Sequence, residues 1–415
     1  MAGKKKIRKY LFHEWDYALI LVSLALSLFG IVMAFSASYY SAISKQGNPY
    51  YFLKNNLMWY AIGWTILIIF AHVDYHKLKQ LAIPGIIIGV LLLVILLLPL
   101  PINKTINNAT RWIGFDPIPV TIMPGEIIKP ALILFFAFLF SRNKRAMRDW
   151  RYVYGSFALI GVIFLLILKQ PNLSTACIVA MLGVSLMFVA GLSWIWVILG
   201  AGGAVGGLFF ILNFTHGYMR RRIVTAFDPW ADKLGDGYQV VQSLLALGSG
   251  GVKGVGFNRS IQKTLYLPEP QSDFILSIVG EELGFIGVLA LFLLYAVLFA
   301  RLISVALRAK DKFGCLLAFG TASLLALHVI LNVLVITATF PPTGVFLPFV
   351  SQGGNATLVF LSLIGITLNV SRQAYIEETD EEKAQMAVET MDEDEVEEEI
   401  LKINSDDTKS KAGEE

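Results

Sequence analysis

Long apolar segments recur along this chain and constrain its fold more than any other feature of the sequence. Each is hydrophobic over roughly the 17 to 25 residues that a helix needs to cross a bilayer. Because their hydrophobicity is continuous and lacks the alternation of a barrel strand, they predict helices. Ten of them can be placed, at residues 17–37, 57–73, 81–99, 126–140, 152–168, 173–191, 193–213, 273–300, 313–337 and 356–370.

Composition supports the same fold class. Of the 415 residues, 56% are hydrophobic and only 16% are charged, which is too little polar surface for a soluble globular protein of this length. We therefore expect an all-α polytopic membrane protein with about ten transmembrane helices. Cys177 and Cys315 both lie within apolar segments and indicate neither a disulfide nor a metal site.

Basic residues in short loops predict the orientation of these helices. The N-terminal segment and the loops at 142–151 and 301–312 carry clusters of Lys and Arg, and ten helices place all three on one side of the membrane. The positive-inside tendency makes that side the cytoplasm. Both termini are then cytoplasmic.

The distribution of charge divides the chain into three parts. A basic N-terminal segment, residues 1–16, precedes a membrane domain at residues 17–372, and residues 373–415 form an acidic tail that includes "MDEDEVEEEI". Acidic segments with few aromatic residues bury too little apolar surface to fold alone, so we expect a disordered cytoplasmic tail. A docking segment for a cytoplasmic partner is the alternative interpretation.

The extracytoplasmic loop at residues 214–272, between the seventh and eighth predicted helices, is long for a helical bundle, and we expect function there. It opens with three consecutive arginines at 220–222. Arginine matches the phosphate oxygens of a lipid head group, although a plain anchor to anionic lipids explains the cluster equally well. Apolar residues at helical spacing from Tyr238 predict an amphipathic helix. We interpret the stretch "GSGGVKGVG" as a flexible turn, on which Lys253 is available to an anion.

Three acids, Asp273, Glu281 and Glu282, follow in "SDFILSIVGEELGFIG", at or inside a predicted membrane helix. A charge in that setting is costly and needs a reason. Asp273 lies near the expected helix N-cap, so a structural cap is one interpretation. Its position at the outer mouth of the bundle, beneath a loop that carries Arg and Lys, suits a general base instead. Glu281 lies ~12 Å deeper, and for Glu281 and Glu282 we expect pairing within an internal polar network.

Two further segments carry candidate site residues. In "MPGEIIKPA", Glu126 and Lys129 are three residues apart, where they can meet on one helix face as an ion pair. Arg111 lies in the loop before them, beside Trp112. The loop "TFPPTGVFLPFVSQGGNATL" is rich in Pro and Gly, and such irregular backbone at membrane depth must line protein or a wet cavity.

The motifs of these segments resemble those of the SEDS family (shape, elongation, division, sporulation) over about residues 15–372. The family pattern P-E-x-x-[ST]-D-F-I followed by G-E-E-L-G is similar to "PEPQSDFI" and "GEELG". P-S-E-x-x-K resembles "PGEIIK", Q-P-D-L-G-T resembles "QPNLST", and P-x-x-G-x-x-L-P-F-x-S-Y-G-G-S-S resembles "PPTGVFLPFVSQGGNAT". The stretches "DPWADKLGDGYQ" and "IQKTLYLPEPQ" look closer to the FtsW and SpoVE branch than to RodA. The chain departs from the family pattern at Asn172, Gln271, Gln352, Asn355 and Ala356.

The resemblance implies a peptidoglycan glycosyltransferase in the bacterial cytoplasmic membrane, active in cell division at the septum or in sporulation. It would polymerise lipid II at the outer face and release undecaprenyl pyrophosphate. Its partners would be the undecaprenyl-linked glycan, a class B penicillin-binding protein and other division proteins, with no nucleic acid.

The resemblance also assigns roles to residues. Asp273 would be the general base, and Glu281 and Glu282 would belong to the internal network. A divalent cation, Mg²⁺ or Mn²⁺, is a further candidate for stabilising the departing pyrophosphate. The expected substrate-binding positions are Arg111, Glu126, Lys129, Arg221, Arg222, Lys253, Lys263, Ser351, Gly353 and Gly354.

Two other functions remain open from the sequence. A lipid II flippase would favour charges near the membrane midplane on interrupted helices related by an internal repeat, and no clear repeat is visible. A non-catalytic scaffold of the division machinery would tolerate loss of the charge on Asp273.

Overall fold

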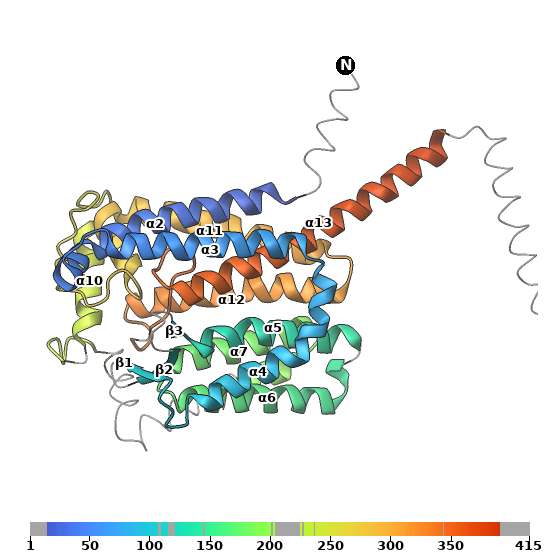
Figure 1. Cartoon of the computed structure of the whole chain (residues 1–415), viewed down its shortest axis with the longest axis horizontal. Helices are drawn as coiled ribbons and strands as arrows, with labels where there is room; N and C mark the ends of the chain where they lie inside the picture. Colours follow the sequence, from blue (N-terminus) through green and yellow to red (C-terminus); the bar gives the residue numbers. More distant parts are fainter. Residues whose placement is uncertain are drawn as a thin grey trace, which may run out of the picture. The chain divides into compact units, whose positions relative to one another are not determined.

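The computed structural model describes residues 15–106, 109–114, 121–143, 146–200, 202–203, 225, 228–235, 237–342 and 344–390. It divides the chain into two units, Tyr17–Val370 and a second one that joins Met1–Asp16 to Ser371–Glu415. Every candidate site residue that is described belongs to the larger unit, which is a helical bundle (Figure 1). The boundaries predicted at residues 16 and 372 stay predictions.

The described elements are mostly helices. In chain order they are α2 (Tyr17–Gln46), α3 (Tyr51–His72), η1 (Tyr75–Leu81), α4 (Ala82–Ile95), β1 (Asn103–Ile106), β2 (Ala109–Gly114), β3 (Thr121–Ile122), α5 (Pro124–Arg142), η2 (Ala146–Arg148), α6 (Trp150–Leu168), α7 (Leu173–Val189), α10 (Tyr238–Gly250), α11 (Ile275–Arg308), α12 (Lys312–Ile336) and α13 (Gly354–Thr390).

Seven helical segments among the described residues are long and apolar enough to cross a membrane. α3 and the shorter α7 coincide with two more of the predicted spans. The predicted span at 193–213 is described only at residues 193–200 and 202–203, so the count of ten and the side of each terminus stay predictions. The seven are α2, Tyr75–Ile95, α5, α6, α11, α12 and the Gly354–Ala374 part of α13.

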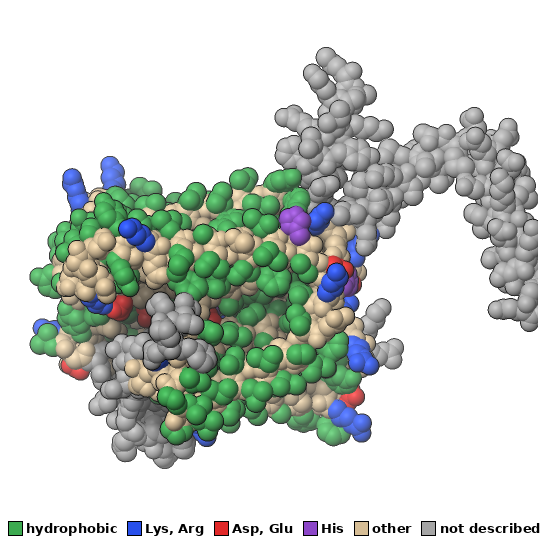
Figure 2. Space-filling view, viewed as in Figure 1, with side chains coloured by type: hydrophobic (Ala, Val, Ile, Leu, Met, Phe, Trp, Pro, Cys, Tyr) green, Lys and Arg blue, Asp and Glu red, His purple; other side chains and the backbone are tan. Residues whose placement is uncertain are grey.

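The larger unit is arranged around α12, which packs against α5, α7 and α11. α2 packs against α3 and α11, α4 against α5, and α6 against α7. A small antiparallel sheet of order β1-β2-β3 lies at the same end of the bundle as α10 (Figure 1). Hydrophobic side chains cover much of the visible flank, while Lys and Arg lie mostly near the two ends (Figure 2). That distribution is the one expected of a membrane-embedded bundle.

α11 is interrupted at Gly284, whose φ of 67° and ψ of −166° are not helical. The glycine-rich loop after α10 fills the interruption. The amide nitrogens of Val255 and Gly256 donate to the carbonyls of Glu281 and Glu282 at 2.9 and 3.0 Å. In return, the amide of Phe285 donates to the carbonyl of Gly251 at 2.9 Å. The stretches "GSGGVKGVG" and "GEELG" therefore form one structural unit, although they are separate in the sequence.

This unit has no room for side chains at two of its glycines. A Cβ atom at Gly284 would lie 2.3 Å from the Gly254 nitrogen, and one at Gly254 would lie 2.2 Å from the Glu282 carbonyl oxygen. Both glycines also have positive φ. The glycine-rich stretch is therefore a fixed contact against α11, which corrects our interpretation of it as a flexible turn.

We expect Gly284→Ala to lower the free energy of unfolding by about 2 kcal/mol or more, since its backbone conformation is nearly restricted to glycine and the new methyl group meets backbone atoms. The matched control is Gly85→Ala in α4, because a Cβ at Gly85 meets nothing within 4 Å. Thermal melts of both purified variants in one detergent test this. Equal midpoints would contradict the close contact between the glycine loop and α11.

Candidate active site

Asp273 is half-buried and lies just before α11, which begins at Ile275. The N-cap position belongs to Phe274, whose side chain makes no cap hydrogen bond. Asp273 therefore lies one residue before the N-cap of this helix. Local sequence places an acid near a helix start, but the chain turns into the helix one residue later than we expected.

Asn332 of α12 and the loop before α13 hold the chain at Asp273 and at the two residues before it. Asn332 of α12 donates through Nδ2 to the carbonyls of Asp273 and Val345, at 2.9 and 2.7 Å. Ser351 Oγ donates to the carbonyl of Ser272, and the amide of Gln352 donates to that of Gln271 at 2.9 Å. These contacts fix the backbone from which the Asp273 carboxyl group projects.

Gly344 brings the same loop against the carboxyl group itself. A Cβ atom at Gly344 would lie 3.0 Å from Asp273 Oδ2. The loop can follow this course because its carbonyls find side-chain donors despite its irregular backbone. His328 contacts the Phe346 carbonyl at 3.1 Å, Tyr295 donates to that of Pro348, and Tyr60 donates to that of Phe349.

A buried ion pair lies at the start of α5. Lys129 Nζ is 2.6 Å from Glu126 Oε1, and the two side chains are 0% and 3% exposed. Lys129 Nζ is also 3.0 Å from His328 Nε2. Since Lys129 can only donate, Nε2 accepts, and Nδ1 of the same ring carries the proton that it donates to the Phe346 carbonyl. Through His328, the ion pair is connected to the loop that passes beside Asp273.

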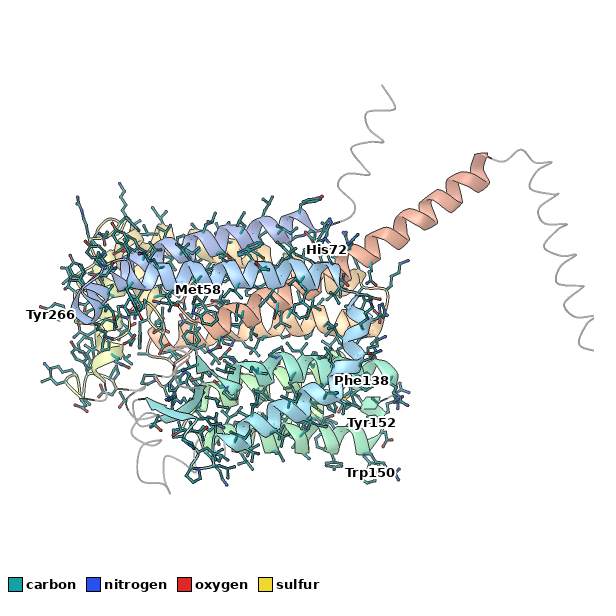
Figure 3. All side chains as sticks on the ribbon, viewed as in Figure 1. Met58, His72, Phe138, Trp150, Tyr152 and Tyr266 are labelled. Carbon is teal, nitrogen blue, oxygen red and sulfur yellow. The ribbon has the colours of Figure 1, made fainter. Side chains whose placement is uncertain are left out.

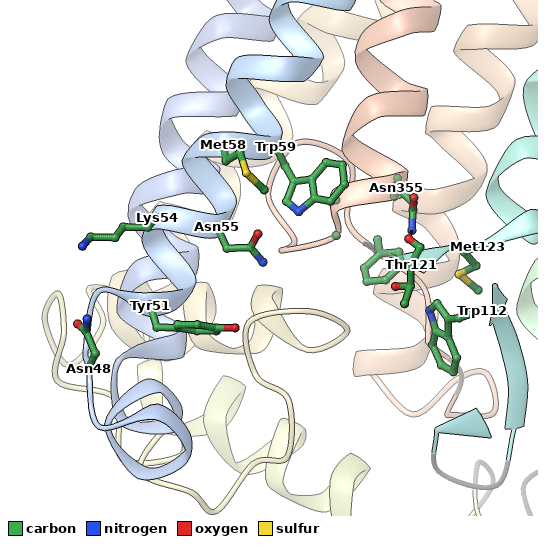
Figure 4. Close-up of a pocket in the computed structure, with 14 residues that line it drawn as sticks. Asn48, Tyr51, Lys54, Asn55, Met58, Trp59, Trp112, Thr121, Met123 and Asn355 are labelled. Carbon is green, nitrogen blue, oxygen red and sulfur yellow. Dashed lines mark hydrogen bonds between the residues drawn. The ribbon is translucent and has the colours of Figure 1, made fainter. Parts of the chain in front are cut away.

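A cavity of about 850 Å³ opens near this loop. Figure 4 shows Asn55 and Trp59 of α3 on one side and Thr121 and Asn355 on the other, while Lys54 points away from the cavity. Phe346 also lines it, so the cavity and Asp273 contact the same loop. The lining residues are Asn48, Tyr51, Lys54, Asn55, Met58, Trp59, Trp112, Thr121, Met123, Phe346, Gly353, Gly354, Asn355 and Ala356.

Glu281 and Glu282 lie on the first, fully buried section of α11. Glu281 accepts hydrogen bonds from the hydroxyl of Ser260 and from the amide of Ile261, the latter at 2.8 Å. Glu282 accepts from Ser36 of α2 at 2.8 Å and from Lys263 at 2.7 Å. The two acids thus bind the loop before α11 to the bundle.

Lys263 is 0% exposed in its pair with Glu282. Its ammonium group also donates to Ser36 Oγ at 2.9 Å and to Asn258 Oδ1. Burial lowers the pKa of Lys263, against the opposing effect of the hydrogen bond and charge of Glu282. The structure therefore groups Lys263 with Glu282, Ser36 and Asn258.

The remaining predicted substrate-binding residues are not all brought together. Arg111 on β2 donates to the carbonyls of Gln170 and Pro171, which hold the turn before α7. Lys253 is exposed at the tip of the glycine loop. Arg221 and Arg222 lie outside the described residues. Gly353 and Gly354 line the cavity, where a Cβ at Gly354 would lie 2.5 Å from the Trp59 ring.

Sequence reasoning missed His328 and Asn332, the two side chains by which α12 holds this region. They are each 1% exposed and four residues apart, so they share one face of the helix. That spacing of polar residues within an apolar helix is visible in "LHVILN" and could have identified them.

Comparison with known proteins identifies the family of this chain. The family described as "Cell cycle protein", which unites FtsW, RodA and SpoVE, matches residues 16–376. The chain belongs to the FtsW/RodA/SpoVE family. Together with its apolar helices, this makes it a multi-pass membrane protein. The resemblance inferred from the sequence motifs is confirmed.

Relatives in the FtsW/RodA/SpoVE family are similar over most of their length. A protein of Geobacter sp. (strain M18) named "Probable peptidoglycan glycosyltransferase FtsW" is 37% identical over 362 residues, which cover 86% of this chain and 96% of that protein. "Stage V sporulation protein E" of Bacillus subtilis (strain 168) is 37% identical over 361 residues, covering 86% and 97%. Both names belong to the branch that the sequence favoured.

Solved structures share the fold. A chain from "Structural coordination of polymerization and crosslinking by a peptidoglycan synthase complex" is similar with a TM-score of 0.71 and 28% identity, covering 87% of this chain and 98% of that one. The crystal structure of the rod shape determining protein RodA of Thermus thermophilus has a TM-score of 0.63 and 26% identity, with the same coverage.

The departures from the motifs of the FtsW/RodA/SpoVE family have structural partners here. Asn172 caps α7, because its Oδ1 accepts from the amide of Thr175 at 3.3 Å. Asn355 donates to the carbonyl of Thr121 at 2.9 Å and so joins α13 to β3. Gln271 and Gln352 meet through backbone atoms. Ala356 is buried and lines the cavity.

We expect Lys129→Met to lower the free energy of unfolding by about 3–5 kcal/mol, because it leaves the Glu126 carboxylate buried without its cation. The double variant with Glu126→Gln should recover much of this loss, since it removes both charges. Thermal or denaturant unfolding of the two variants in one detergent measures the difference. A double variant no more stable than Lys129→Met would contradict direct pairing.

Proposed function

We propose that this protein is a peptidoglycan glycosyltransferase that polymerises lipid II at the outer face of the cytoplasmic membrane, in cell division or sporulation. The observation that carries the proposal is its similarity, over 86% of the chain, to a protein named as a probable peptidoglycan glycosyltransferase. The acid held beside the loop before α13, at the end of the bundle that carries the sheet, is consistent with this chemistry.

Asp273 is the general base of the proposed reaction. Its carboxylate takes the proton from the acceptor sugar hydroxyl as the hydroxyl oxygen attacks the anomeric carbon of the donor. The bond from that carbon to the pyrophosphate oxygen breaks, and undecaprenyl pyrophosphate leaves. A direct displacement of this kind inverts the anomeric configuration. Asn332, Gly344 and Ser351 support the step by fixing the position of the carboxylate.

The cavity beside Phe346 is the proposed place for part of the lipid-linked substrate. Its volume of about 850 Å³ falls within the range of small-molecule sites. The indole rings of Trp59 and Trp112 provide apolar surface, and the amides of Asn55 and Asn355 provide hydrogen-bonding groups. This combination of apolar walls and a few polar groups is typical of a ligand pocket.

Of the described cations proposed for the pyrophosphate, Lys253 is the most accessible. Lys129 and Lys263 are fully buried and already paired with Glu126 and Glu282. Their charges can act on the pyrophosphate only over a distance, whereas the ammonium of Lys253 is exposed. We therefore assign direct contact to Lys253, together with Arg221 and Arg222, which lie outside the described residues.

A divalent cation stays a proposal. The described residues contain no group of three or more His, Cys, Asp or Glu side chains that could hold a metal ion. Mg²⁺ often binds through one or two carboxylates together with substrate phosphates. Mg²⁺ or Mn²⁺ would therefore be bound mainly by the pyrophosphate of the substrate, and no step above requires it.

A class B penicillin-binding protein is the proposed partner, since a similar chain belongs to a complex described as coordinating polymerization and crosslinking. The loop between α10 and α11 exposes apolar side chains that suit a protein interface. Val252 and Ile261 are each 63% exposed, and Tyr266, labelled in Figure 3, is 53% exposed. Septal localisation is part of the same proposal.

We expect Asp273→Asn to lower the rate of lipid II polymerisation by about 100-fold or more, because the amide cannot accept the proton. The assay uses labelled lipid II and the purified protein, alone and with its transpeptidase, with equal melting temperatures as proof of folding. Asp232→Asn, an exposed acid on the outer loop, is the matched control and should stay active.

Other outcomes of this assay lead to different functions. Equal activity of wild type and Asp273→Asn would remove Asp273 from the chemistry. Inactivity of both proteins in the presence of partner, lipid and divalent ions would favour a flippase or a scaffold.

We expect Ser351→Ala to lower the polymerisation rate at saturating lipid II more than it raises the apparent KM, because Ser351 positions Asp273 through Ser272 and contacts no substrate. The substitution removes two hydrogen bonds, the one that Ser351 Oγ donates to the Ser272 carbonyl and the one that it accepts from the Leu347 amide, and should cost about 2 kcal/mol of stability. Ser362→Ala in α13 removes a local bond to the Val359 carbonyl and is the control. A pure KM effect would argue that Ser351 binds substrate directly.

A further inference from the structure

A second cavity, of about 430 Å³, lies between α5 and α6 and belongs to none of the residues assigned above. Figure 3 labels Tyr152, which lines it, and the neighbouring Phe138 and Trp150. Its walls are largely apolar, and its size falls within the range of small-molecule sites. The lining residues are Phe135, Leu139, Arg151, Tyr152, Gly155, Ser156 and Leu159. We call it the α5–α6 groove.

The groove is open at Gly155, because glycine has no side chain to fill it. Gly155 is exposed on α6, and a Cβ atom there would meet nothing within 4 Å. α6 packs mainly against α7, which leaves this side of the helix open toward α5. Ser156 beside it is 2% exposed, and its Oγ has no hydrogen-bond partner in the described part of the chain. Ser156 therefore lines the groove while its hydroxyl group is buried without a partner among the described residues.

Aromatic residues locate the groove relative to the membrane. Trp150 is 65% and Tyr154 is 54% exposed, and their rings contact each other with centroids 6.1 Å apart. Exposed Trp and Tyr at a helix end are typical of the head-group level. Arg151 lies at this level, and Leu159 is eight residues, or ~12 Å, farther along the helix. The groove thus extends from the head groups into the acyl chains of one leaflet.

The loop next to the groove is basic. Arg142, Arg148 and Arg151 are exposed on this loop, which the sequence predicts to be cytoplasmic, and of the three only Arg151 lines the groove. Within the described residues, Arg151 takes part in no ion pair and contacts only the Trp150 ring, at 5.7 Å. The neighbouring acid, Asp149, caps α6 by accepting from the Arg151 amide at 2.9 Å. The Arg151 guanidinium is therefore available to an anion.

We propose that the α5–α6 groove binds an anionic phospholipid, with one acyl chain along Phe135, Leu139 and Leu159 and the phosphate at Arg151. A basic pocket between membrane helices on the cytoplasmic side suits such a head group. An arginine fork can bind two phosphate oxygens at once. This site lies on a different loop from Asp273 and the cavity beside Phe346.

The test is native mass spectrometry of the full-length protein with added dioleoyl phosphatidylglycerol or phosphatidylethanolamine. Wild type should retain phosphatidylglycerol in preference. Gly155→Leu should lower its affinity by roughly tenfold, because the new side chain occupies the space of two or more methylene groups. Gly161→Leu is the matched control on the same helix: its Cβ also meets nothing within 4 Å, and Gly161 does not line the groove.

Charge is tested separately. Arg151→Gln should weaken phosphatidylglycerol binding about fivefold and leave phosphatidylethanolamine unchanged, while Arg148→Gln, outside the groove, should keep the preference. Equal effects of the two glycine variants, or equal binding of the two lipids by wild type, would overturn the proposal. A third outcome would also overturn the proposal. If Gly155→Leu retains the lipid but no longer copurifies with a partner protein, a helix of that partner occupies the groove and not a lipid. The readout is lipid occupancy, so failure here leaves the glycosyltransferase proposal untouched.

Discussion

The interruption of α11 at Gly284 is the constraint on which the outer half of this bundle depends. A helix that stops hydrogen-bonding within itself exposes carbonyls, and those of Glu281 and Glu282 accept from the loop after α10. The loop is thereby fixed against the helix, which covers the buried section before the break. Asp273 ends this same loop. The position of the proposed base therefore depends on Gly284 in α11 and Gly254 in the loop, neither of which is adjacent to Asp273 in the sequence.

Buried charges join parts of the bundle that are distant in sequence. Lys263 and Glu282 connect the outer loop to α2 through Ser36, and Lys129 and Glu126 connect α5 to α12 through His328. A buried ion pair adds little net stability, but removing one partner is costly. Such pairs therefore contribute mainly to specificity: they favour the arrangement of helices in which each buried charge meets its partner. The Lys129–Glu126 pair reaches the loop beside Asp273, because His328 contacts both Lys129 and the Phe346 carbonyl.

Local patterns in the sequence predicted the local features of this structure. Apolar segments marked most helices, and the three-residue spacing of Glu126 and Lys129 marked an ion pair that the structure contains. Local patterns could not predict contacts between residues that are distant in sequence. Lys263 was expected to bind substrate, whereas its ammonium group is paired with Glu282 of α11 and with Ser36 of α2. The contact of two glycine-rich stretches was equally hidden, since each resembles an ordinary turn by itself.

The contacts around Asp273 explain which positions tolerate change. Gln271 and Gln352 meet through a backbone amide and carbonyl, so other side chains can occupy these positions without loss of that hydrogen bond. Asn332 and Ser351 use side-chain atoms to reach backbone carbonyls, and no other contact replaces them in the described structure. Of the departures from the family motif, Gln271 and Gln352 are joined through the backbone, whereas Asn172 and Asn355 make their contacts through side-chain amides. Around Asp273, the positions at which we expect a substitution to displace the base are therefore Asn332 and Ser351.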